Sequence, residues 1–101
     1  LLSRTAKNQR HLTTGPKVLK ILVRFFAIYR ERSGVSKKVF QMPPDSSVLD
    51  LINALRNQYP NLAPSDVQIV VAVNNEYASQ QFVLKNDDEV ALIPPVSGGQ
   101  S

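Results

Sequence analysis

The stretch SVLDLINALRNQYP, residues 47–60, decides the fold because it specifies one amphipathic helix and marks both of its ends. The Ser47 hydroxyl can accept a hydrogen bond from an early helical amide, and Asp50 can reach back, which makes a capping box. Pro60 disfavours a helical conformation at Tyr59 and ends the helix there. The apolar stripe comprises Val48, Leu51, Ile52, Leu55 and Tyr59, and the expected outer face comprises Asn53, Arg56 and Asn57.

Upstream of this helix, residues 18–27 alternate with period two, which predicts a strand with one face in the core. Phe26 belongs to the opposite face, where an aromatic side chain stands out among charges. Residues 28–36 are expected to be a connection that turns at Gly34. Residues 37–42 are expected to form a second short strand. The expected core face of the first strand contains Leu19, Ile21, Val23, Phe25 and Ala27.

Downstream, VQIVVAV at residues 67–73 is rich in β-branched residues and nearly apolar on both faces, which suits a central strand. Asn74-Asn75 predicts a turn, because Asn tolerates positive φ. Residues 82–84 are expected to form a short strand or an extended piece. Residues 89–93 are expected to be the last strand, with Ile93 on the face away from the helix.

The order strand, strand, helix, strand, short strand, strand predicts an α+β domain. Roughly 25 residues separate the second and third strands, enough for a helical crossover. One amphipathic helix covers one face of a sheet, so we expect a β-grasp, ubiquitin-like fold: a mixed sheet of four to five strands wrapped on one main helix. We assign residues 1–17 to a basic arm, 18–97 to the domain and 98–101 to a Gly-Gly tail with two extra residues.

Composition excludes most self-sufficient catalytic sites. The 101 residues suit one domain and contain no Cys, so no thiolate nucleophile, disulfide or Cys-based zinc site exists. The single histidine, His11, lies in the arm. Asp87-Asp88-Glu89 has the carboxylates that a hard cation prefers, but we interpret it as a solvated turn before a strand. We expect no metal, no permanently bound cofactor and no enzymatic activity of the chain on its own.

The net charge of +4 belongs to the arm: residues 1–20 contain five basic and no acidic residues, and residues 21–101 contain seven basic and eight acidic ones. We therefore expect no nucleic-acid partner. The longest apolar run, Ile21 to Tyr29, is interrupted by Arg24 and is shorter than the roughly 20 residues of a membrane span. We expect a cytoplasmic protein without a membrane partner. We interpret the arm, which contains no acidic residue, as a translated extension. The alternative is an organelle transit peptide.

The end of the chain, PPVSGGQS at residues 94–101, carries the chemistry. Two glycines make a narrow tail that fits a channel where any Cβ would clash, and the prolines stiffen its exit from the sheet. A carboxylate on Gly99 is unreactive until adenylation makes it an acyl phosphate anhydride that sulfur or an amine can attack. On its own the Gly-Gly pair fits a disordered tail. Attached to a β-grasp domain, it favours an activated C-terminus.

Residues 18–99 resemble the small subunits of molybdopterin synthase, which are sulfur carriers. The resemblance rests on LVRFFAIYRERSG at 22–34, VAVNNEY at 71–77, DDEVALIPPV at 87–96 and the closing SGG. PPVSGG is the most specific part. Thiazole-forming sulfur carriers share the fold and the Gly-Gly pair, but they typically lack the FFA…RE opening and the PPV lead-in.

The resemblance implies that an E1-like adenylating and sulfurating enzyme uses ATP to adenylate Gly99, which then becomes a thiocarboxylate. Gly98 is its slender neighbour. The tail would enter the large synthase subunit, within a heterotetramer, and donate sulfur to cyclic pyranopterin monophosphate to form the molybdopterin dithiolene. The resemblance also implies a set of partner-binding residues: Phe26, Tyr77, Ile93, Pro94, Pro95, Val96 and Ser97.

Two features depart from the family pattern. Gln100-Ser101 follows Gly99, so a protease must remove it, unless it is a cloning remnant or this copy is inactive. The basic arm, residues 1–17, is absent from compact members of the family. Three other functions fit the same residues: sulfur delivery to thiazole or cysteine synthesis, ubiquitin-like modification of lysines through Gly99, and a plain interaction module with a disordered tail.

Overall fold

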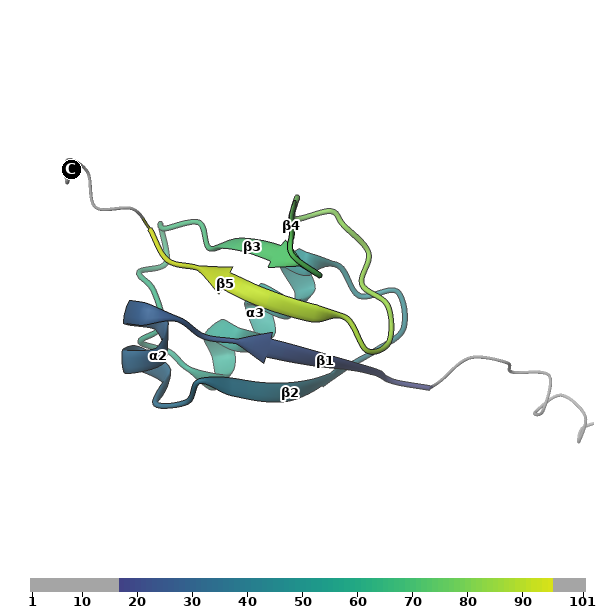
Figure 1. Ribbon diagram of the computed structural model, residues 1–101, viewed down its shortest axis with the longest axis horizontal. Coiled ribbons are helices and arrows are strands. Elements are labelled where there is room, and N and C mark those ends of the chain that lie inside the picture. The colour runs from purple at the N-terminus through teal and green to yellow at the C-terminus, as the bar shows by residue number, and fades with distance from the viewer. Residues whose placement is uncertain (1–16, 96–101) are drawn as a thin grey trace, which may run out of the picture.

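Five strands join in one mixed sheet in the computed structural model, which describes residues 17–95 (Figure 1). The strand order is β2-β1-β5-β3-β4, with β1 and β5 parallel and the other pairs antiparallel. This arrangement confirms the predicted α+β, ubiquitin-like class. The elements are β1 (Leu19–Arg24), α2 (Ala27–Ser33), β2 (Lys37–Met42), α3 (Val48–Gln58), β3 (Val70–Val73), β4 (Glu76–Ala78) and β5 (Glu89–Ile93).

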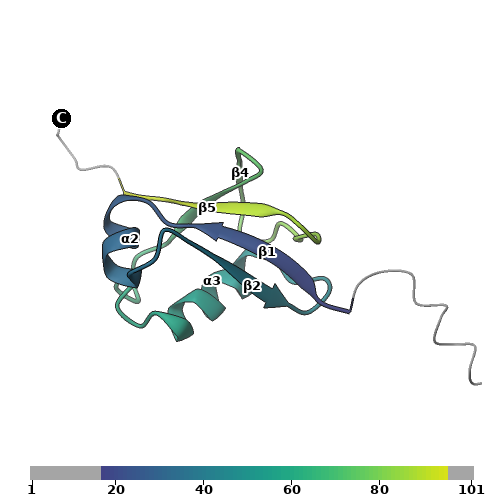
Figure 2. The ribbon, with the colours of Figure 1, turned by 60° about the horizontal axis from the view of Figure 1, so that its bottom comes forward.

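The helix α3 lies against one face of the sheet (Figure 2) and begins at the predicted capping box. The Asp50 amide donates to the Ser47 hydroxyl over 3.2 Å, and the Ser47 amide donates to the Asp50 carboxylate over 2.9 Å. Tyr59 ends the helix, and its amide donates to the Leu55 carbonyl over 2.8 Å. Within α3 the buried residues are those of the predicted stripe: Val48, Leu51, Ile52 and Leu55.

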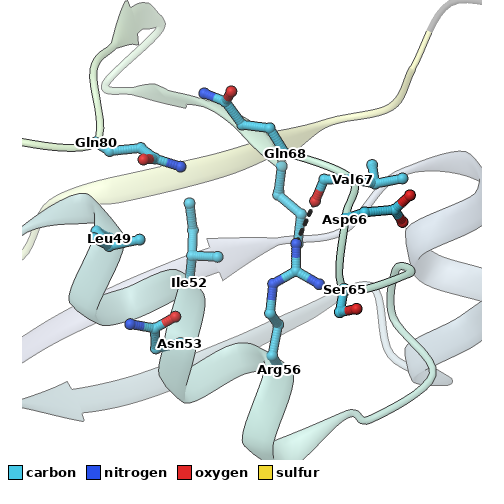
Figure 3. Close-up of a pocket in the computed structure, with 10 residues that line it drawn as sticks. Leu49, Ile52, Asn53, Arg56, Ser65, Asp66, Val67, Gln68 and Gln80 are labelled. Carbon is cyan, nitrogen blue, oxygen red and sulfur yellow. Dashed lines mark hydrogen bonds between the residues drawn. The ribbon is translucent and has the colours of Figure 1, made fainter.

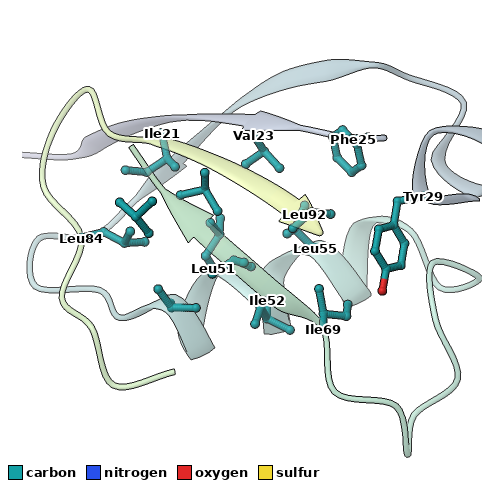
Figure 4. Packing of buried hydrophobic residues seen from close by; sticks show 14 of the residues in the cluster. Ile21, Val23, Phe25, Tyr29, Leu51, Ile52, Leu55, Ile69, Leu84 and Leu92 are labelled. Carbon is teal, nitrogen blue, oxygen red and sulfur yellow. The ribbon is translucent and has the colours of Figure 1, made fainter. Parts of the chain in front are cut away.

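The inner face of the sheet covers this stripe (Figure 4). The ring of Phe25, just after β1, packs edge-on against Tyr59, with 5.6 Å between the ring centroids. The alternation predicted for the first strand is thus confirmed from Leu19 to Phe25. The strands contribute to the buried core Leu19, Ile21 and Val23 from β1, Met42 from β2, Val71 and Val73 from β3, and Val90 and Leu92 from β5.

The expectation of a plain connection over residues 28–36 was wrong, because the chain forms the short helix α2 there. β1 ends at Arg24, and Ala27 is exposed rather than part of the core face. Gly34 closes α2 in the left-handed conformation, with φ +83°, and its amide donates to the Arg30 carbonyl. Tyr29 then enters the core. Seven residues are too few for a helical period to stand out, so only the closing glycine signalled the helix.

Three further expectations need correction in the second half of the chain. The strand predicted at 67–73 is confined to Val70–Val73. The turn at Asn74-Asn75 is confirmed, with both residues at positive φ, but it leads into an unpredicted strand, β4. The extended piece at 82–84 makes only one isolated bridge, between Val83 and Ser47. β4 has three residues, again too few for a recognisable alternation.

Arg56 does not simply face solvent, as its place on the outer helix face suggested. Its guanidinium donates to the main-chain carbonyls of Ala63, Pro64 and Val67. From α2, Arg32 donates to the Leu62 carbonyl over 3.1 Å. The two arginines therefore hold the segment that connects α3 to β3. Their partners lie 7 to 30 residues away in the chain, a distance at which no sequence pattern shows them.

Replacing Ser47 with Ala should lower the free energy of unfolding by about 1 kcal/mol, because α3 loses the side-chain cap of its first turn. For a domain of this size the thermal midpoint should then fall by about 4–8 °C. Denaturant and thermal unfolding followed by circular dichroism would measure both. Ser79→Ala is the matched control, since Ser79 is exposed and its side chain makes no hydrogen bond to residues 17–95. Equal stabilities of the two variants would contradict the role assigned to the cap.

Candidate functional site: the tail exit and its surroundings

The chain leaves the sheet at the end of β5, its central strand, between β1 and β3 (Figure 1). Pro94 and Pro95 follow the last strand residue, Ile93. The predicted reactive residues Gly98 and Gly99 lie outside the described part of the chain, as do Val96 and Ser97. The structure therefore defines the platform from which the tail starts.

A hollow of about 260 Å³ lies at this exit. We call it the exit hollow, and it is lined by Tyr29, Gln68, Val70, Tyr77, Ile93, Pro94 and Pro95. The β3–β5 register explains part of this set, since Val70 lies directly opposite Ile93. Tyr77 comes from β4, where it lies opposite Ala72, and is 76% exposed. The structure thus brings together four residues predicted for partner contacts: Tyr77, Ile93, Pro94 and Pro95.

Three lining residues were missed by the sequence analysis: Tyr29, Gln68 and Val70. Val70 is 44% exposed although it sits in an apolar run, and such a run does not tell which residue faces outward. Tyr29 was assigned to a connection, and Gln68 to a strand that begins two residues later. The hollow depends on side chains from α2, β3, β4 and β5, so only the tertiary structure reveals it.

Phe26, the remaining predicted contact residue, lies at the same end of the sheet but not in the lining of the hollow. It precedes α2 as its N-cap residue and is 39% exposed. The Arg24 guanidinium carbon lies 5.9 Å from the centre of its ring, and Nη1 of the same guanidinium donates to the Glu89 carboxylate over 3.1 Å. Both partners of this ion pair are more than two-fifths exposed, so it contributes at most about 1 kcal/mol. Phe26 is therefore a half-exposed neighbour of the site.

Tyr29 is the buried member of the exit hollow, with only 2% of its surface exposed. Burial raises the pKa of its hydroxyl above the ordinary value of 10.0, and the positive charges of Arg32 and Arg56 oppose that shift. The hydroxyl is consequently protonated near neutral pH and available as a hydrogen-bond donor.

A second cavity, of about 300 Å³, lies between α3 and the segment before β3 (Figure 3). Its residues include Leu49, Asn53, Arg56 and Asp66, and none of the predicted site residues. Figure 3 shows the Arg56 guanidinium pointing at the Val67 carbonyl. Three main-chain carbonyls already occupy this cation, so the cavity is best understood as a consequence of how the connection is held.

The interpretation of Asp87-Asp88-Glu89 as a solvated turn was wrong for Asp88, which takes part in the hydrogen bonds of the turn before β5. Asp88 is buried and accepts hydrogen bonds from the Lys85 amide, at 2.7 Å, and from the Asn74 side chain, at 3.0 Å. Within residues 17–95, no three His, Cys, Asp or Glu side chains are grouped so that they could hold a metal ion. The same residues contain no helix long and apolar enough to cross a membrane.

Sequence comparisons connect this platform to proteins of known role. The ThiS family model matches residues 23–99. The molybdopterin synthase sulfur carrier subunit of Arabidopsis thaliana is 35% identical over 81 residues, which cover 80% of this chain and 84% of that protein. The subunit of the same name from Homo sapiens is 36% identical over 83 residues, covering 79% and 94%.

Solved structures agree with the sequence relatives. The putative molybdopterin converting factor subunit 1 from Pyrococcus furiosus superimposes with a TM-score of 0.69 at 29% identity, covering 77% of this chain and 99% of that one. Small archaeal modifier protein 1 from Haloferax volcanii gives 0.70 at 28% identity, with the same two coverages. These matches confirm the resemblance read from the FFA…RE and PPVSGG motifs. The chain belongs to the ThiS family.

Proposed function

We propose that this chain is the sulfur carrier subunit of molybdopterin synthase. One observation carries the proposal: curated relatives that bear this name are 35–36% identical over about four-fifths of the chain. The tail supports it, because the Gly-Gly pair follows the central strand of the sheet after two prolines. A glycine tail on a folded domain suits delivery of a small reactive group into another protein's active site, because glycine has no side chain to clash with a narrow channel.

The proposed chemistry takes place on Gly99. An E1-like enzyme transfers AMP from ATP to the Gly99 carboxylate and releases pyrophosphate. A hydrosulfide, the sulfur nucleophile, then attacks the acyl carbon and displaces AMP, which leaves a thiocarboxylate. Inside the large synthase subunit the thiocarboxylate sulfur attacks cyclic pyranopterin monophosphate. Water then hydrolyses the acyl–sulfur bond, which leaves the sulfur on the pterin and regenerates the Gly99 carboxylate. ATP is thus used by the activating enzyme, and the carrier itself holds no permanent cofactor.

The sequence printed here continues past the reactive glycine. Hydrolysis of the Gly99–Gln100 peptide bond would expose the carboxylate that adenylation requires, so we propose that Gln100-Ser101 is removed before activation. We place these steps in the cytoplasm, in a heterotetramer of two small and two large subunits.

The proposed docking surface consists of Phe26, Tyr77, Ile93 and the segment 94–97. Its support is geometric: Tyr77, Ile93, Pro94 and Pro95 share the exit hollow, and Phe26 lies at the same end of the sheet. The outward side chains Phe26 and Tyr77 are 39% and 76% exposed although they are aromatic. Exposed aromatic groups beside a reactive tail are typical of a surface that a partner covers.

A second candidate function has its own support in the likeness to small archaeal modifier protein 1. In that case the activated Gly99 would be attacked by a lysine amine and form an isopeptide bond. Covalent ladders on a denaturing gel, lost when Gly99 is removed, would favour this modifier function over sulfur transfer.

A chain that ends at Gly99 should form a thiocarboxylate when mixed with the activating enzyme, ATP and a sulfur donor, and a chain that ends at Ser97 should form none. Both chains should unfold at the same temperature, because the last strand, β5, ends at Ile93, upstream of the deleted residues. Intact-mass measurement and calorimetry give the two readouts. A lower thermal midpoint for the shorter chain would mean that the glycines support the fold instead.

Phe26→Asp and Tyr77→Asp should each weaken binding to the large subunit about tenfold or more, because each removes an aromatic anchor and adds a charge. Both should still fold: Asp is a favoured N-cap residue at position 26, and Tyr77 is mostly exposed. Leu49→Asp is the matched control, since Leu49 is 41% exposed on α3, across the sheet from this surface. Calorimetric affinities equal to that of the unaltered chain would remove either residue from the docking surface.

A further inference from the structure

The Tyr29 hydroxyl has no hydrogen-bond partner among residues 17–95, although the residue is only 2% exposed. Buried tyrosine hydroxyls normally find a partner, because leaving a polar group unpaired costs free energy. The aromatic ring packs in the core, where Tyr29 is among the largest fully buried side chains. The Tyr29 hydroxyl, which has no partner in the described part of the chain, could therefore donate a hydrogen bond to a group of a bound partner.

Figure 4 shows the Tyr29 side chain reaching from α2 towards Ile69, with the hydroxyl at its far end. Ile69 stands between Gln68 and Val70, two residues that line the exit hollow with Tyr29. The polar end of Tyr29 thus lies at the β3 side of this hollow. Arg32 and Arg56 are near enough for their charges to act on Tyr29, but guanidinium groups are donors only and cannot accept the proton of the hydroxyl.

Both arginines are moreover occupied. Arg32 donates to the Leu62 carbonyl, and Arg56 donates to three carbonyls of the segment 63–67. Their positive charges still act on Tyr29, where they lower the pKa of the hydroxyl against the effect of burial. The same positive charges would attract a negatively charged group placed beside the hydroxyl. The environment of the hydroxyl therefore calls for an acceptor oxygen, and a carboxylate or amide oxygen suits it better than another donor.

Apart from Gln68, whose side chain makes no hydrogen bond to Tyr29, the remaining walls of the exit hollow are mainly apolar: they consist of Val70, Ile93, Pro94 and Pro95, with Tyr77 at the exposed side. A group that fills it must have an apolar stem and a polar tip. The hollow also adjoins the point where the chain leaves the sheet, since Pro94 and Pro95, which lead to the tail, line it. A protein that takes up the tail therefore comes close to this opening.

We propose that the exit hollow receives one side chain of the large synthase subunit, with an apolar stem and a terminal carboxylate or amide oxygen that accepts a hydrogen bond from the Tyr29 hydroxyl. This inference rests on the proposed function, which supplies the large subunit as partner. The anchor would fix the carrier at the base of its tail and so set the direction in which Gly98 and Gly99 extend. A glutamate or glutamine has the required shape.

Tyr29→Phe tests the anchor, because it removes one oxygen and keeps the ring. Affinity for the large subunit should fall about 2- to 150-fold, the range from one hydrogen bond to a neutral partner up to one to a charged partner. The thermal midpoint of the chain alone should stay the same or rise, since the variant loses a buried hydroxyl that has no partner within residues 17–95. Tyr59→Phe is the matched control: Tyr59 is a half-buried tyrosine outside the hollow, and its loss of oxygen should leave affinity unchanged.

A second pair of variants tests the hollow itself. Val70→Lys places a long charged side chain at its rim and should weaken binding about tenfold or more. Val39→Lys adds the same charge to the same face, on β2, where Val39 is 56% exposed, and should not. Both positions are outward on strands, so both variants should fold.

The outcomes are distinguishable. If the unaltered chain does not bind the large subunit, the proposed function fails, and this inference fails with it. If it binds and Tyr29→Phe binds equally well, only the anchor is overturned. A lowered thermal midpoint of Tyr29→Phe would overturn it too, by revealing a partner for the hydroxyl within the chain. A defect confined to adenylation by the activating enzyme would assign the hollow to that enzyme.

Discussion

Burial of the α3 stripe against the inner face of the sheet is the constraint on which the rest of the structure depends. Leu51 and Leu55 are completely buried, and each such side chain contributes about 1.5–3 kcal/mol by leaving water. The strands must match that stripe with their alternate residues. A slip of one residue in β5 would turn Val90 and Leu92 outward, so the register of the central strand is fixed by the helix that it covers.

The position of the tail follows from this register. With Leu92 held inward, Ile93 points to the other face, and Pro94-Pro95 carries the chain away at the end of the central strand. Val70, paired with Ile93, is turned outward by the same rule. The same alternation that buries Leu92 in the core therefore places Ile93 and Val70 on the opposite face of the sheet, where they line the exit hollow. A reactive terminus that starts from a fixed position at the end of β5 suits the delivery of a reactive group into a partner protein.

Helices and strands long enough to show a period could be predicted from the sequence. Shorter elements, and contacts that several elements form together, could not. The helix at 47–59 and the strand face from Leu19 to Phe25 contain enough residues to establish a period. α2 and β4 are too short to do so. Arg56 was predicted to be an outer-face residue, because no sequence pattern indicates the main-chain carbonyls to which it donates. Tyr77 and Ile93 were chosen from a family resemblance, whereas Tyr29 needed the folded chain, since four elements meet around it. Gly98 and Gly99 came from the sequence alone.

The central claim concerns the end of the chain, and intact-mass spectrometry of the protein recovered from its own organism tests it most directly. The account predicts a chain that ends at Gly99, with part of the population carrying sulfur in place of one carboxylate oxygen. A population that retains Gln100-Ser101 throughout, with no sulfur at the terminus, would contradict it. The domain would then be a β-grasp module whose tail is closed to this chemistry.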